Sequence, residues 1–152
     1  DPRLSNHHFS NLTKEWSWKT PLRTDYARRQ ALIEIDVLTA MSLGLTLDEL
    51  QTIYRFEFFQ LQSYESETYY DANGRIVFTS NKSLNEVGFK NDEFDKIKDA
   101  KSGTFTRTIK DTTLSDIPTE KVIHYVAPFD KCNRKDDYLT TWNFFSAKFL
   151  KK

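Results

Sequence analysis

The apolar positions between residues 24 and 63 recur with the period of two α-helices joined at a glycine. The first predicted helix begins at Thr24 or Asp25 and ends at about Leu43. Its apolar residues cover more than one face, so we expect it to be buried on most sides. Gly44 suits the left-handed residue that follows a helix end.

The second predicted helix begins at residues 46–49, whose sequence TLDE is a capping box. We expect this helix to end at about Ser63 and to form an αα-hairpin with the first. Its apolar residues fall on one stripe, which consists of Leu50, Ile53, Tyr54, Phe58 and Leu61.

Short strands are predicted beyond the helical hairpin. Residues 67–70 and 75–79 flank Asn73-Gly74, and the tolerance of this dipeptide for positive φ predicts a β-hairpin. Two further strands are predicted over residues 104–109 and 121–127, where β-branched residues are frequent.

Two more helices are predicted in the second half of the chain. Asn91 caps a short acidic helix that ends at about Ala100. Asn133 caps a last helix, in which acidic side chains of the first turn favour the helix dipole. The last helix carries a wholly aromatic stripe, formed by Tyr138, Trp142, Phe145 and Phe149.

These elements indicate an α+β fold, with the αα-hairpin and the C-terminal aromatic helix packed on a small, mainly antiparallel sheet. The length of 152 residues is typical of one domain, which we place at residues 24–152 after an N-terminal arm of residues 1–23. Because 14% of the residues are aromatic, we expect a core of large rings. The chain begins at Asp1 without a methionine, and we interpret it as a fragment of a longer protein.

The single cysteine, Cys132, excludes an internal disulfide framework. One free thiol fits a reducing compartment, so we expect a cytoplasmic protein. No apolar run approaches the length of about 18 residues that a membrane span needs, so no membrane partner is expected.

The formal net charge is zero, but residues 31–70 carry one base and seven acids. This balance argues against non-specific nucleic-acid binding as the sole role. A local basic surface remains open, and a hairpin that carries Tyr69 and Phe78 could add stacking rings. The competing interpretation is that one face of this hairpin packs on the helices and the other face is ordinary surface. The candidate phosphate contacts are Arg28, Arg29, Arg75, Lys82 and Arg107.

No catalytic residue, metal site or cofactor site is predicted. The four glycines are too scattered for a phosphate- or cofactor-binding loop. The sequence from Asp99 to Lys101 resembles half of a nuclease motif, but it falls at a predicted helix end. We interpret His124 as a strand histidine. Glu34 and Asp36 are interpreted as the polar margins of the buried helix face, bridging to Arg28, Arg29 or Arg55.

Three segments carry a resemblance to a known family. They are ARRQALIEIDVLTAMSLGLTLDELQTIYRFEFFQLQSYE, YYDANGRIVFT and APFDKCNRKDDYLTTWNFF. These segments resemble the C-terminal region of large bacterial restriction–modification proteins, which are adenine-specific DNA methyltransferases of phage-defence systems. The resemblance covers residues 26–80 and 127–147.

The resemblance implies a function in DNA modification and restriction. In such proteins catalysis lies in upstream domains, so S-adenosylmethionine would belong to the parent protein and this region would be a non-catalytic accessory domain. Such a domain would position DNA or dock on the upstream catalytic domains. The alternative is a protein–protein interaction module with no direct nucleic-acid contact. The DNA target sequence and the oligomeric state do not follow from the sequence.

Overall fold

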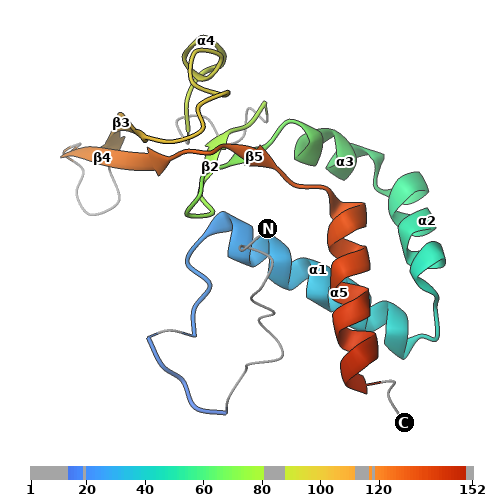
Figure 1. The fold of residues 1–152 in the computed structure, drawn as a ribbon. Helices are drawn as coiled ribbons and strands as arrows, with labels where there is room; N and C mark the ends of the chain where they lie inside the picture. The colour runs from blue at the N-terminus through green and yellow to red at the C-terminus, as the bar shows by residue number, and fades with distance from the viewer. Residues whose placement is uncertain (1–13, 19, 81–87, 112–116, 118, 150–152) are drawn as a thin grey trace. The chain divides into compact units, whose positions relative to one another are not determined.

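The computed structural model describes residues 14–18, 20–80, 88–111, 117 and 119–149, and it is drawn in Figure 1. The chain divides into two compact units. The helical unit comprises residues 1–66 and 132–152, and the strand unit comprises residues 67–131.

Four helices make up the described part of the helical unit. They are α1 (Asp25–Ser42), α2 (Leu47–Glu57), α3 (Phe59–Ser66) and α5 (Arg134–Phe149). Helix α1 begins where predicted, because the Thr24 side chain accepts a hydrogen bond from the backbone N–H of Ala27. The predicted cap of α5 is also confirmed, since Asn133 Oδ1 accepts from the backbone N–H of Lys135 at 3.1 Å.

The corner between α1 and α2 has the predicted chemistry. Gly44 adopts a φ of 75°, and the N–H of Leu45 donates to the carbonyl of Ala40 at 3.0 Å, which closes the end of α1. Thr46 and Glu49 form the capping box of α2, with the Thr46 N–H donating to the Glu49 carboxylate at 2.7 Å. Local sequence is therefore sufficient to turn the chain here.

The second predicted helix is divided into two. Helix α2 ends at Glu57, Phe58 adopts a non-helical ψ of 37°, and α3 begins at Phe59. The break separates the stripe that runs from Leu50 to Leu61 into parts on two helices.

The core of the helical unit forms where α1 and α2 pack against α5. Its buried members come from all three helices: Ile33, Val37, Ala40, Leu50, Tyr54, Tyr138 and Phe145. Two edge-to-face rings, Tyr54 and Tyr138, lie 5.9 Å apart between centroids, so the expected aromatic core is confirmed here.

Helix α1 differs from the expectation that most of its sides are buried. Leu32 and Ile35 are 56% and 45% exposed, whereas the polar Arg29, Gln30 and Glu34 are buried. The face of the helix that packs on the core therefore contains both polar and apolar residues, and part of the apolar surface of the helix is exposed to solvent.

The described residues of the strand unit form two antiparallel sheets and one short helix. Strand β1 (Tyr69–Tyr70) lies between β2 (Ile76–Phe78) and β5 (Asp130–Lys131). The sequence analysis did not predict β5. The two strands predicted over residues 104–109 and 121–127 are confirmed as β3 (Thr104–Asp111) and β4 (Thr119–Val126), which pair with each other along their whole length. Helix α4 covers only Asn91–Phe94.

Asp71 joins the two sheets at the predicted hairpin. It is fully buried, and its Oδ1 accepts from the N–H groups of Asn73 and Arg75 at 3.0 Å and 2.8 Å. Its Oδ2 accepts from the N–H of Val126 on β4 at 3.1 Å. The hairpin is confirmed, with Gly74 at a φ of 78°, and the side chain of Asp71 orders it as much as the Asn-Gly pair does.

The described residues therefore form a mixed α+β fold with small antiparallel sheets, as predicted. One domain from residue 24 to 152 stays a prediction. Most of the predicted N-terminal arm, including residues 1–13, lies outside the described residues, as does Lys82.

Candidate functional site

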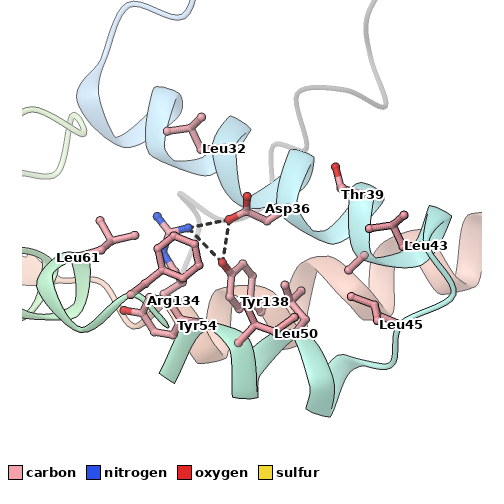
Figure 2. Close-up of a pocket in the computed structure, with 13 residues that line it drawn as sticks. Leu32, Asp36, Thr39, Leu43, Leu45, Leu50, Tyr54, Leu61, Arg134 and Tyr138 are labelled. Atoms are coloured by element: carbon pink, nitrogen blue, oxygen red, sulfur yellow. Dashed lines mark hydrogen bonds and ion pairs between the residues drawn. The ribbon is translucent and has the colours of Figure 1, made fainter. Parts of the chain in front are cut away.

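A groove with a volume of about 440 Å³ opens between α1 and α2 (Figure 2). Helix α1 contributes Leu32, Asp36 and Thr39, and its C-cap residue contributes Leu43; these residues recur every three or four positions and so share one stripe. Helix α5 lies behind them and closes the floor. The remaining lining residues are Ala40, Leu45, Leu50, Ile53, Tyr54, Phe58, Leu61, Arg134 and Tyr138. We call this site the α1–α2 groove.

The sides of the α1–α2 groove are apolar and open to solvent. Leu43 is 70% exposed, and Ile53 and Phe58 are 40% and 48% exposed. Two further large apolar side chains at the α2–α3 break, Phe56 and Phe59, are 67% and 74% exposed. Adjoining large apolar side chains at the surface are typical of a binding face.

One wall of the groove is polar. Oδ2 of Asp36 accepts from Nη1 of Arg134 at 2.9 Å and from the hydroxyl of Tyr138 at 2.8 Å, as the dashed lines in Figure 2 show. The Asp36 side chain is 40% exposed, whereas Arg134 is buried. In the described part of the chain, Oδ1 of Asp36 has no hydrogen-bond partner.

Behind this wall lies a buried network of charges. Glu65 accepts from Arg134 through Nε and Nη2 and from Nε of Arg29 at 2.9 Å. Nη1 of Arg29 donates to Asp137 at 2.6 Å. With Asp36, these residues form what we call the charge cluster, which holds three acids and two bases and so carries a formal charge of −1.

The charge cluster shifts the pKa values of its members in opposite directions. Burial alone would raise the pKa of Glu65, but the hydrogen bond from Arg134 and the charges of both arginines hold it below its ordinary value. Burial raises the pKa of Asp137, and its contact with Arg29 offsets this only in part. Burial also raises the pKa of Tyr138 to about 12, so its hydroxyl stays protonated and donates to Asp36.

The groove has the features of a binding site. The Asp36 carboxylate and the Tyr138 hydroxyl at its polar wall are hydrogen-bonded to each other. No group of three metal-ligating side chains occurs among the described residues. A concave apolar surface of this volume with a few polar groups at one wall can hold an apolar ligand and orient it.

The predicted phosphate contacts that the structure describes are divided between the two units, with Arg28 and Arg29 in the helical unit and Arg75 and Arg107 in the strand unit. Arg28 is exposed on α1, 3.8 Å from Asp25, and Arg75 is exposed on the hairpin, with Nη1 3.4 Å from the His124 carbonyl. Arg107 is half-buried and donates to Glu93 at 3.0 Å.

Arg29 is only 6% exposed, and Asp137 and Glu65 both accept hydrogen bonds from its guanidinium. It therefore supports the core in this structure, and a phosphate would have to displace two carboxylates to reach it. Arg28 belongs to the helical unit and Arg75 belongs to the strand unit, so neither unit alone carries both arginines.

The sequence analysis missed Arg134 and Glu65, the residues at the centre of the charge cluster. The spacing of Arg134 and Tyr138, one helical turn apart, was an available signal, because it places a cation and a hydroxyl on one face. The expectation that Asp36 bridges to an arginine was right in kind, but the arginine is Arg134, from the other end of the chain.

The other residues that the sequence analysis considered for chemistry are not among the lining residues of the groove. His124 and Asp99 are exposed, and Cys132 is half-buried before α5. Within the described residues no helix is both long and apolar enough to span a membrane.

Comparisons of the chain with models of protein families, with curated proteins and with solved structures found no match. The resemblance to restriction–modification methyltransferases therefore stays a prediction. The functional argument depends on the α1–α2 groove and its surroundings.

Proposed function

We propose that this chain is a non-catalytic docking module of a DNA restriction–modification protein of the adenine-methylating type. Its role is to bind the catalytic part of the parent protein. The observation that carries the docking role is the open α1–α2 groove, with exposed Leu43, Ile53 and Phe58 at its sides. The DNA-modification context depends on the sequence resemblance alone.

Charge favours docking over DNA contact at the groove. Residues 31–70 have a formal charge of −6, and Asp36 places a carboxylate in the groove wall. A phosphate backbone would be repelled here, because DNA binding relies on cations that neutralise phosphates. Apolar side chains of a protein partner would instead remove the exposed leucine, isoleucine and phenylalanine from water.

The polypeptide encoded immediately upstream of this chain is the partner to test. Produced as a separate protein and mixed with the whole 152-residue chain, it should form a complex in sedimentation-velocity experiments. Its sequence should contain a glycine-rich cofactor loop and an Asp/Asn-Pro-Pro-aromatic tetrapeptide, the motif that binds the flipped adenine base in DNA adenine methyltransferases. An upstream product without these motifs would overturn the methyltransferase context, and one that has them but forms no complex would overturn the docking role.

A second candidate function is DNA positioning by Arg28 and Arg75. The observation that favours it is the exposure of both guanidinium groups, with Arg28 at 64% for its side chain. Among the described residues neither arginine has a close ionic partner, since Asp25 lies 3.8 Å from Arg28 and the Arg75 guanidinium donates to the His124 carbonyl.

A salt titration of DNA binding tests this second function. Contact with two phosphates would give a slope of log affinity against log salt of about −2, and Arg75→Ala would reduce it by about 1 for every DNA sequence. The matched control is Arg55→Ala, another exposed arginine. Absence of binding at low salt would eliminate direct DNA contact by this chain.

A further inference from the structure

We infer that the occupant of the α1–α2 groove is an amphipathic helix of a protein partner, with a lysine or arginine beside its apolar residues. This inference depends on the proposed docking function and specifies the chemistry of the partner. It is argued from the shape of the groove, the exposure of its sides and the charge at its polar wall.

The shape of the groove fits a helix. Leu32 and Leu43 mark its extent on α1 and are 11 positions apart, which corresponds to about 17 Å at 1.5 Å per residue. This is about three turns of a partner helix. Because α1 and α2 both pack on α5 and meet each other at the corner near Leu45, the space above α5 is bounded by helices on both sides (Figure 2).

The apolar sides offer contacts along this length. Leu43 and Leu45 lie at the corner end of the groove, and Leu61 lies at the other end in Figure 2. A helix with apolar residues at positions i, i+4, i+7 and i+11 would present one side chain per turn to this surface. Leu43 at 70% exposure would lose the most water-accessible surface.

A cation on the partner would complement the negative charge of the polar wall. Oδ2 of Asp36 is occupied by Arg134 and Tyr138, and its Oδ1 has no hydrogen-bond partner within the described residues. The charge cluster has a formal charge of −1. Among the described lining residues the only base is Arg134, whose guanidinium already binds Glu65. A lysine or arginine of the partner would pair with Asp36 and balance this charge.

Two synthetic helical peptides test the inference. They share leucines at the four positions above and differ only in one side chain beside them, which is lysine in the first peptide and glutamate in the second. Binding of each labelled peptide to the whole chain is measured by fluorescence anisotropy. We expect the lysine peptide to bind about tenfold more tightly than the glutamate peptide.

Variants of the chain locate the site. Leu43→Glu should abolish binding of the lysine peptide, whereas Leu139→Glu, at a 45% exposed leucine of α5 outside the groove, should leave it unchanged. Asp36→Asn should bring the affinities of the two peptides within about threefold. Since this substitution also touches Arg134, chemical-shift mapping on the unsubstituted chain provides an independent readout, with changes expected along α1 and α2.

Several outcomes would overturn the inference. These are binding of neither peptide, equal binding of both, or equal weakening by Leu43→Glu and Leu139→Glu. A dimer of the chain that Leu43→Glu dissociates would identify a second copy as the occupant.

The inference and the docking function fail in distinguishable ways. If the upstream protein binds and Leu43→Glu leaves that complex intact, the docking function stands and the groove is not the site. If the lysine peptide binds in the groove but the upstream protein forms no complex, the groove chemistry stands and the proposed partner is wrong.

Discussion

Arg134 holds the carboxylate of Glu65 with a fork of two nitrogens, Nε at 3.1 Å and Nη2 at 2.9 Å. The two residues are 69 positions apart, at the start of α5 and near the end of α3. Both side chains are almost buried, at 5% and 12% exposure. This contact joins α5 to α3 and holds the guanidinium that also donates to Asp36 at the wall of the α1–α2 groove.

Glu65→Gln should destabilise the helical unit. The substitution removes one negative charge between Arg29 and Arg134, and a buried pair broken on one side typically costs about 3–5 kcal/mol. The measurement is the free energy of unfolding from chemical denaturation. Glu57→Gln, at an exposed glutamate of α2, is the matched control and should change that free energy by less than about 0.5 kcal/mol.

Acid should weaken the unsubstituted protein through Glu65. The pKa of Glu65 is lower in the fold than its ordinary value of 4.5, so its contribution is present above that value and is lost as the pH falls through the folded pKa. Asp137 acts in the opposite sense, because its pKa is raised above 3.8 and its protonation relieves a buried charge. We expect a net loss of stability below about pH 4.5, since Glu65 has more hydrogen bonds to lose.

The same pH series on Glu65→Gln isolates this effect. Without the titrating carboxylate, the free energy of unfolding should vary less between pH 5 and pH 3, or rise as Asp137 is protonated. An equally steep acid loss in Glu65→Gln would show that other groups are responsible.

Two glycines with the same φ of 75° should respond differently to alanine. At Gly44 an added Cβ meets no atom within 4 Å, so Gly44→Ala should cost only the strain of the left-handed backbone, about 1–2 kcal/mol. At Gly88 the Cβ would collide with the backbone carbonyl of Val77, so Gly88→Ala should cost clearly more. Denaturation of the two variants side by side checks the order, and equal losses would contradict it.

Asp71→Ala should destabilise the strand unit. Three backbone N–H groups, those of Asn73, Arg75 and Val126, would lose their acceptor, at a cost of about 2–4 kcal/mol. Faster amide hydrogen exchange at Val126 would locate the effect. Asp99→Ala, at an exposed aspartate, should leave both stability and exchange unchanged.

Local signals explain why much of the fold could be predicted. The cap at Thr24, the glycine corner at Gly44 and the Asn-Gly turn each depend on residues a few positions apart. The site could not be predicted in this way. Its members, Asp36, Glu65 and Arg134, are separated by tens of residues, and nothing in the local pattern of α1 indicates which arginine Asp36 meets.

The burial of individual residues also required the tertiary structure. The sequence analysis treated Arg29 as a surface cation because of its residue type. In the structure two carboxylates from other segments hold it inside the helical unit. Leu32 and Ile35 belonged with the core by the same reasoning, and both are exposed. Helix periodicity assigns residues to faces but does not say which face a neighbouring helix covers.

The sequence by itself determined where α1, α2 and α5 begin, the main strands and the turns at Gly44 and Gly74, because propensity, capping and turn chemistry act over a few residues. The tertiary structure alone decided that α1 and α2 both pack on α5 and leave a groove between them, with Asp36 held at its wall by Arg134 and Tyr138. The physical reason is that helix packing and buried ion pairs depend on contacts between distant segments, and these contacts form only when the chain folds.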